Sequence, residues 1–474
     1  MTNPNIVAAI VLGSSKIIGI VGTKEVDGTI RVKSHVSQTS SDFIGKGRVL
    51  NVEKMANCLV GIKSQLEEQA SCKIKYYYAA INCLGLRSTI NEVSKHFPDS
   101  ELVTDEFLTS IAVQNREGKP NGREILDAIP LEYRLGMKGS TITHEPKGMQ
   151  TDHIQAKYLN LICNTNTIAT IKSCFRKAGM ELAGGRLHIG IHQLASVVTN
   201  EQERSTGCVV VDMGSDTTSV AVYRGKLLRH MVVIPLGSNS ITHDIENVFY
   251  VERDEAEQLK RNYGYPDPEQ ADDKEEFNLR DGGRTKKYSE LASIIDARVE
   301  EIVQNVKHQI DLSQVSHETI VNGIYLCGGG AQMKNIISAF KNHFEGWNVR
   351  IVNKATRLTI ACSDPNFNEF GNFNTALGLI DNAEINCYGG EYQGLFSNDD
   401  VAIEEVEETS ADEEARLAEE ARLKAEQEER EAREAAEAEE RAKAEEAAKQ
   451  KGGKLGDLLK GWGKKLADLV SDDV

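Results

Sequence analysis

Two segments of this chain, about 200 residues apart, are built in the same way. The first, residues 6–21, is an apolar β-branched run, a turn of Gly, Ser and Lys, and a second apolar run. The second, residues 208–223, repeats this order around a turn of Gly, Ser, Asp and Thr. Such runs predict strand hairpins, and their duplication indicates two related halves. The turns suit phosphate oxygens because they direct backbone N–H groups at one point, although most single Gly-Ser turns hold nothing.

A third element lies at residues 324–333, where an apolar strand ends in three glycines and is followed by a helical run at 334–344. Glycines let the backbone approach a flat ligand, and a helix N-terminus attracts anions. The plainer interpretation is a mobile loop between a strand and a helix. Glu257 and Lys260 lie between the second and third elements, three residues apart in a helical pattern, where an exposed ion pair is the plainer interpretation.

The formal net charge of -17 is concentrated in one part of the chain. Residues 399–448 carry 21 acidic and 7 basic side chains, whereas residues 449–474 carry 4 acidic and 6 basic ones. The remaining body is only mildly acidic, so we expect no nucleic-acid partner. The nine cysteines stand singly, the first residues lack a basic signal region, and no stretch approaches about 20 apolar residues. We expect a cytoplasmic protein with reduced thiols.

The end of the chain changes character twice. Residues 399–448 are rich in Glu, Ala and Arg, which predicts a disordered spacer or a solvated helix of roughly 75 Å. From residue 454 onward, seven apolar side chains fall within an arc of about 120° when placed at 100° per residue. They are Leu455, Leu458, Leu459, Trp462, Leu466, Leu469 and Val470. This pattern predicts an amphipathic helix.

Three occupants are compatible with that apolar face: the protein's own core, a groove on a partner, or a lipid surface. Docking on its own core is the commonest fate of such a stripe, but a docking helix rarely needs a spacer of about 50 residues. Trp462 among lysines favours a lipid interface. Because ordering the helix largely offsets the gain from burial, we expect weak and reversible membrane binding.

The paired hairpins, the glycine loop, the AEQLK run at 256–260 and the TALGL run at 375–379 resemble the nucleotide motifs of the actin, Hsp70 and sugar-kinase superfamily. Within it, the chain most resembles the FtsA family of bacterial cell-division proteins. The signatures are IIDARVEEI at 294–302, LAS at 194–196, ILDAIP at 125–130 and EPKGM at 145–149. The resemblance covers about residues 5–390 and resumes at the extreme C-terminus.

The resemblance implies an α/β, actin-like (ribonuclease H-like) two-lobed fold with a nucleotide in the cleft and a small inserted α+β domain. The first lobe would hold subdomain 1A (residues 1–82, 164–195 and 373–395) and the inserted domain 1C (83–163). The second would hold subdomains 2A (196–238 and 302–372) and 2B (239–301). An acidic linker (396–453) and an amphipathic membrane-targeting helix (454–474) would follow.

Carried over residue by residue, the resemblance implies a site for ATP and Mg²⁺. One side of the phosphates would be held by Gly13, Ser14, Ser15 and Lys16, and the other by Gly214, Ser215, Asp216 and Thr217. Asp212 would act on Mg²⁺ through water, since hard oxygen ligands suit that ion. Adenosine would be bordered by Gly328, Gly329, Gly330 and Met333, with Glu257 and Lys260 reaching its base or ribose.

Two departures from the family pattern affect this chemistry. Relatives usually place Asp two residues before the first turn's glycine, but here that position is Val11. The second turn is usually rich in glycine in relatives but reads Gly214-Ser215-Asp216 here, so Asp216 adds a negative charge near the phosphates. Its repulsion of a phosphate at about 4 Å is about 4 kcal/mol at an effective dielectric constant near 20, before a metal ion or hydrogen bonds offset it. Hydrolysis needs a group that positions water, and His192 and Gln193 are the candidates. We therefore expect ATP binding with slow or absent turnover.

The function implied by the resemblance is a peripheral adaptor of cell division on the cytoplasmic face of the plasma membrane at the division site. Its body would polymerise with itself, recruit later division proteins and bind the C-terminal tail of FtsZ through residues 239–301. Arg298 is a candidate contact for that tail, and an ordinary helix-surface charge is equally compatible. The alternatives are an ATP-driven kinase or chaperone of the same fold and a PilM-like pilus adaptor, which the tail helix disfavours.

Overall fold

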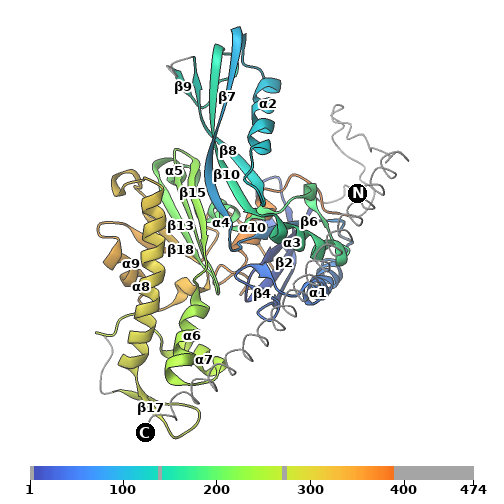
Figure 1. Ribbon diagram of the computed structural model, residues 1–474. Coiled ribbons are helices and arrows are strands. Elements are labelled where there is room, and N and C mark those ends of the chain that lie inside the picture. Colours follow the sequence, from blue (N-terminus) through green and yellow to red (C-terminus); the bar gives the residue numbers. More distant parts are fainter. Residues whose placement is uncertain (1–4, 137–140, 270–274, 389–474) are drawn as a thin grey trace, which may run out of the picture. The chain divides into compact units, whose positions relative to one another are not determined.

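The computed structural model describes residues 5–136, 141–269 and 275–388, and the expected linker and tail helix lie outside this range (Figure 1). The first of its two main sheets contains the first hairpin, β1 and β2, which pair antiparallel. In spatial order its strands are β11 (Glu181–Leu182), β6 (Tyr76–Ile81), β1 (Ile6–Leu12), β2 (Lys16–Lys24), β3 (Ile30–Thr39) and β20 (Ile360–Ala361), with β12 (His188–Ile189) also on β6.

Helices cover both faces of this sheet because side chains alternate along its strands. A Cβ atom at Gly19 of β2 would lie 2.8 Å from Ile62 of α1, whereas one at Gly22 would lie 3.3 Å from Ile380 of α10. The helices of this part are α1 (Val52–Ala70), α3 (Thr165–Lys177), α4 (Gly190–Val198) and α10 (Asn374–Asp381), with a 3-10 turn at Ala183–Gly185. The small hairpin of β4 (Ile44–Gly45) and β5 (Arg48–Val49) precedes α1.

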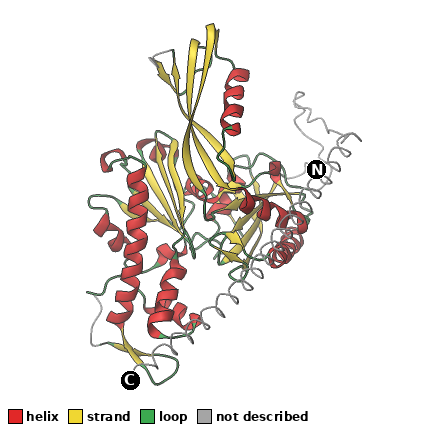
Figure 2. Ribbon diagram, in the orientation of Figure 1, coloured by secondary structure: helices red, strands yellow, loops and turns green. Residues whose placement is uncertain are grey.

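The second sheet contains the second hairpin, β13 and β14. In spatial order its strands are β19 (Val349–Ile351), β18 (Ile324–Cys327), β13 (Cys208–Met213), β14 (Thr218–Arg224), β15 (Leu227–Ile234), β7 (Arg87–Leu102), β10 (Gln150–Asn164), β8 (Arg123–Leu135) and β9 (Thr141–Thr143). Its other elements are α5 (Glu201–Thr206), α6 (Ser238–Phe249), α7 (Arg253–Tyr263), α8 (Tyr288–Leu312), α9 (Ile336–His343) and the hairpin of β16 (Glu276–Asn278) and β17 (Thr285–Lys287), with 3-10 turns at His317–Thr319 and Gly329–Gln332. Figure 2 shows the long helix α8 beside these strands.

The strands β7, β10, β8 and β9 form an insert that joins the second sheet through a single pairing, Val232 with Arg87. Helix α2 (Asp105–Glu117) packs on it, and the pair encloses its own buried cluster, which includes Phe97, Ile111 and Ile154 (Figure 1). Thr104 caps α2 by accepting a hydrogen bond from the Phe107 amide at 3.3 Å.

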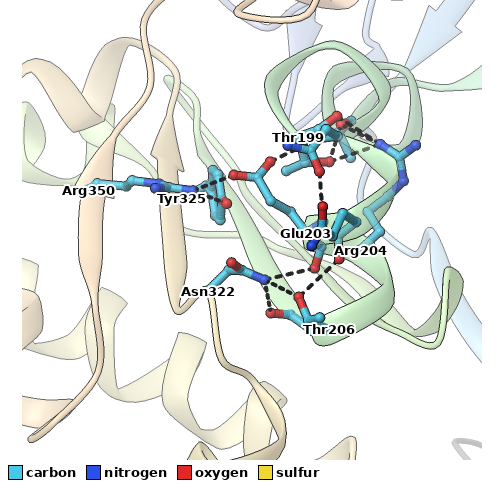
Figure 3. Close-up of polar contacts among 11 residues, drawn as sticks. Thr199, Glu203, Arg204, Thr206, Asn322, Tyr325 and Arg350 are labelled. Atoms are coloured by element: carbon cyan, nitrogen blue, oxygen red, sulfur yellow. Dashed lines mark hydrogen bonds and ion pairs between the residues drawn. The ribbon is translucent and has the colours of Figure 1, made fainter.

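The connection from α4 to β13 is held by a polar network, drawn in Figure 3. Asn200 and Glu203 form a reciprocal cap on α5, and the Glu203 carboxylate also accepts a hydrogen bond from Arg350 at 2.8 Å. Asn322 donates to the Glu203 carbonyl oxygen at 3.0 Å and to the Thr206 hydroxyl at 2.7 Å. The network therefore attaches the segment that connects α4 with β13 to the second sheet.

Candidate functional site

The first hairpin turn is closed by a hydrogen bond from the Gly13 amide to the Lys16 carbonyl oxygen at 3.1 Å. Glycine is required there, since a Cβ atom would lie 2.6 Å from that carbonyl oxygen. The hydroxyl of Ser40 donates to the Gly13 carbonyl oxygen at 2.7 Å. The buried Ser14 hydroxyl accepts a hydrogen bond from the Gly47 amide at 2.9 Å, which attaches the β4–β5 hairpin to this turn.

Lys16 is partly buried at the end of this turn, and its Nζ donates to the Asn372 Oδ1 atom at 2.9 Å. Burial lowers the pKa of Lys16, and the positive charge of Arg261 on α7 lowers it further. Lys16 of the first turn and Arg261 of α7, which also pairs with Glu257 at 2.6 Å, are therefore close enough for their like charges to interact. An anion bound between them would relieve that repulsion.

The second hairpin turn has the same closure, with the Gly214 amide donating to the Thr217 carbonyl oxygen at 2.8 Å. In this turn, both carboxylate oxygens of Asp216 accept hydrogen bonds. Its Oδ2 atom accepts a hydrogen bond from the Lys46 amide at 3.0 Å, and its Oδ1 atom accepts one from the Asn239 side chain at 2.7 Å. The carbonyl oxygen of Ser215, also in this turn, accepts a hydrogen bond from the backbone amide of Asn239 at 2.7 Å.

Asp212 ends β13 immediately before the second turn and lies partly buried. Its Oδ2 atom accepts a long hydrogen bond, 3.3 Å, from the Asn82 side chain, which in turn accepts one from the Ile191 amide at 2.9 Å. Burial raises the pKa of Asp212 to about 6. A carboxylate that is costly to ionise and has a weak partner fits a nearby cation such as Mg²⁺.

The position of Val11 limits what such a cation could contact. Val11 lies on β1 beside Ala80 of β6, so an isopropyl group stands where relatives carry a second carboxylate. Within the described ranges, no group of three or more His, Cys, Asp or Glu side chains could hold a metal ion. Magnesium would therefore rely on Asp212, water and phosphate oxygens.

The glycine loop lies against the second turn's strand. Gly328 has a φ of +84°, and a Cβ atom there would lie 2.5 Å from Asp212 Oδ1. One at Gly330 would lie 3.0 Å from the Met213 side chain, whereas one at Gly329 would meet no atom within 4 Å. The loop differs from the expectation in one detail: the 3-10 turn at Gly329–Gln332 and a left-handed Asn335 separate Gly328 from α9. Met333 is partly buried between them.

Glu257 and Lys260 of α7 form an ion pair of 2.6 Å that is not exposed, because only 7% of the Lys260 side chain is accessible. Its Nζ atom also donates to the Thr242 hydroxyl at 2.7 Å and the Ser238 carbonyl oxygen at 3.0 Å. Burial lowers the pKa of Lys260. Burial also opposes ionisation of Glu257, but hydrogen bonds from Lys260, Thr242 and Arg261 hold its pKa below the ordinary value. The pair fixes α7 against the start of α6.

His192 and Gln193 lie on α4, and their side chains do not approach the turns. The His192 ring lies 3.3 Å from the hydroxyl of Tyr223, which pairs with Cys208 at the opposite end of the second hairpin from its turn. Five strand residues separate these ends, roughly 16 Å. Gln193 accepts from the Asn382 side chain at 2.9 Å. Both line a separate hollow of about 490 Å³.

Arg298 lies on α8, where its guanidinium makes two hydrogen bonds of 2.6 and 2.9 Å to the Asp244 carboxylate of α6. It also contacts Glu301. Its charge is therefore balanced within the described part of the chain.

The structure adds four residues that the sequence analysis did not identify. They are Ser40, Lys46, Asn82 and Asn239, which join the two turns and Asp212 to the surrounding backbone. Asn82 directly follows the buried strand β6, as Gly13 follows β1, so its place at a strand end was a usable signal. The other three have no such pattern, since their roles depend on which distant segment they contact.

Two similar hairpin turns, a carboxylate at a strand end and a glycine loop lie between the two sheets, and this arrangement is an α/β, actin-like fold. A solved structure described as "PilM-PilN type IV pilus biogenesis complex" contains a chain of this fold. Its TM-score is 0.54 and its sequence identity 17%, over 79% of this chain and 97% of that chain. Within the described ranges, no helix is both long and apolar enough to cross a membrane.

The family model described as "FtsA: Cell division protein FtsA" matches residues 209–376. Cell division protein FtsA of Escherichia coli (strain K12) is 27% identical over 404 residues, which cover 82% of this chain and 93% of that protein. Cell division protein FtsA of Bacillus subtilis (strain 168) is 24% identical over 422 residues, which cover 87% and 91%. The chain is similar to the FtsA family of cell division proteins over most of its length.

Proposed function

We propose that this protein binds ATP with Mg²⁺ between its two hairpin turns and attaches FtsZ filaments to the membrane at the division site. The observation that carries the nucleotide part is the convergence of the two turns: the Gly47 amide contacts Ser14 and the neighbouring Lys46 amide contacts Asp216. The glycine loop approaches the same turn, since a Cβ atom at Gly328 would lie 2.5 Å from Asp212 Oδ1. Phosphates would lie between the turns, and adenosine beside the glycine loop and α7.

Replacing Gly329 with aspartate is expected to weaken Mg·ATP binding by about tenfold or more. Its Cβ position is empty within 4 Å, so the protein tolerates the side chain, which then occupies ligand space and adds a negative charge. Isothermal titration calorimetry measures the effect against a wild-type affinity in the micromolar range. Gly283→Asp is the matched control because its Cβ position is equally open and lies in the β16–β17 turn. No binding heat in the wild type, or equal affinities in all three proteins, contradicts the site.

Turnover by this site is expected to be slow or absent. His192 and Gln193, the candidates for positioning water, contact Tyr223 and Asn382 instead of the turns. The site supplies one candidate metal-binding carboxylate, Asp212, because Val11 replaces the second. The geometry thus supports nucleotide as a binding partner rather than as a rapidly consumed substrate.

The proposed membrane attachment uses residues 454–474, which lie outside the described residues. Trp462→Glu is expected to lower the lipid-bound fraction at least several-fold, because it places a charge within the apolar arc. Flotation of the full chain with vesicles containing anionic lipid measures this fraction. Ala467→Glu, which adds the same charge outside the arc, is the control. An unchanged bound fraction for Trp462→Glu contradicts membrane attachment through this helix.

The proposed partners are FtsZ, further copies of this chain and later division proteins, on the cytoplasmic face of the membrane. Weak membrane helices gain from assembly, since a polymer presents many of them at once. The FtsZ tail would bind the region of residues 239–301, where Arg298 is already paired with Asp244. A tail residue at that point would have to displace or extend this ion pair.

A pilus-assembly adaptor is the second candidate, favoured by the fold shared with the chain of the PilM-PilN complex. The two functions differ in their soluble partner. Co-sedimentation with FtsZ filaments in the presence of vesicles separates them: recruitment of FtsZ to lipid supports the division function, and its absence favours the second candidate.

A further inference from the structure

The turn of the β4–β5 hairpin lies between the two hairpin turns and contacts both. Lys46 and Gly47 form its tip, with φ values of +51° and +69°. The Gly47 amide donates to Ser14 of the first turn at 2.9 Å, and the Lys46 amide donates to Asp216 of the second turn at 3.0 Å. Two consecutive N–H groups are thus directed at acceptors from different sheets.

The position of this tip is tightly restricted. The Lys46 carbonyl oxygen accepts a hydrogen bond from the Leu84 amide at 2.9 Å. A Cβ atom at Gly47 would lie 2.2 Å from the Asn82 carbonyl oxygen, so the backbone there is in close contact with the end of β6. The tip is therefore held against the end of β6, which fixes the position of the Lys46 amide.

The carboxylate of Asp216 is the acceptor for the Lys46 amide. Its two oxygens are shared between the Lys46 amide on one side and the Asn239 side chain on the other, at 3.0 and 2.7 Å. Backbone and amide N–H donors that converge on a carboxylate would serve a phosphate oxygen equally well. The carboxylate thus occupies an anion position formed by two N–H donors from different segments.

We propose that Asp216 acts as an internal anion that holds the two hairpin turns together without a ligand. This inference rests on the proposed nucleotide site, since it assigns to Asp216 the bridging role that a phosphate would otherwise take there. Two consequences follow. The ligand-free protein keeps its turns joined, and an incoming phosphate meets a negative charge that is already bound in place.

Asp216→Ala tests the proposal through hydrogen–deuterium exchange of the full chain. Loss of a charge-assisted hydrogen bond is expected to speed exchange in the segment of residues 44–49 by about 10- to 100-fold. Inorganic phosphate is expected to restore protection in the variant, while sodium chloride at equal ionic strength is not. Asp281→Ala is the matched control, because Asp281 also accepts from backbone amides, those of Gly283 and Arg284, in another loop.

The outcomes separate this proposal from the nucleotide site itself. Unchanged exchange at residues 44–49 in Asp216→Ala, or exchange that phosphate does not slow, overturns the internal anion. If inorganic phosphate restores protection of residues 44–49 in Asp216→Ala but Mg·ATP does not, the internal anion is supported and the proposed ATP site is contradicted. If Asp216→Ala does not fold, Asn239→Ala removes the neighbouring donor and keeps the carboxylate. That variant is expected to speed exchange less than tenfold, and protection equal to wild type in it then contradicts the shared anion position.

Discussion

Replacing Gly47 with alanine is expected to lower the free energy of unfolding by about 3 kcal/mol or more. Two effects add at this position. A φ of +69° is costly for any residue with a Cβ atom, and that atom would lie 2.2 Å from the Asn82 carbonyl oxygen and 2.6 Å from Cys83 Cα. Because both neighbours are backbone atoms, neither can move without displacing the end of β6. The substitution should also release the hydrogen bond to Ser14.

Gly28→Ala is the control for this effect. Gly28 has a similar φ of +84°, but its Cβ position meets no atom within 4 Å. Only the conformational penalty of about 1 kcal/mol remains. Urea unfolding of the full chain, followed by circular dichroism, gives both values. Similar losses in the two variants would mean that the close approach of Gly47 to β6 does not contribute to stability.

Asp212→Asn is expected to stabilise the ligand-free protein above pH 6 and to weaken Mg²⁺-dependent ATP binding. The folded protein raises the pKa of this carboxyl to about 6, from an ordinary value near 3.8. Its contribution to stability is therefore fully present below about pH 4 and is lost as the pH rises through 6. At neutral pH the loss is about 2 kcal/mol, less than the full shift implies because the side chain keeps some contact with water.

Unfolding measured at about pH 5 and pH 7.5 tests this sign. The advantage of Asp212→Asn over the wild type should be larger at the higher pH, where the wild-type carboxyl is ionised. Asp281→Asn provides a contrast, because hydrogen bonds from Arg284 and its neighbours lower the pKa of Asp281. That variant should therefore lose stability at neutral pH. An advantage of Asp212→Asn that does not change with pH would indicate a packing effect instead of a buried charge.

Much of the site's local structure was predictable from short stretches of sequence. Both hairpins and the strand that ends at Cys327, just before the three glycines, are found where the residue pattern places them. The Glu257 and Lys260 pair shows the limit of such patterns. Its spacing indicated contact, but its burial depends on Thr242 and Ser238 of another helix, which α7 alone does not specify.

The departures at Val11 and Asp216 were also visible in the sequence, but their consequences were not. Asp216 read alone is a charge that repels phosphate, whereas the fold gives it two hydrogen-bond donors, Lys46 and Asn239. His192 and Gln193 are adjacent to the start of α4, near Asn82, yet their side chains point to Tyr223 and Asn382. The direction in which each side chain projects from α4 therefore determines its contacts, and closeness in sequence to the start of the helix does not.

Strand periodicity, turn composition and the glycine positions defined the two halves of this protein, because these features depend on sterics between near neighbours. The contacts between the two halves were decided only by the tertiary structure. Lys46 and Asp216 are 170 residues apart, and Asn82 and Asp212 are 130 apart. Such contacts form only when both sheets have packed, since hydrogen bonds between distant segments require positions that no local pattern encodes.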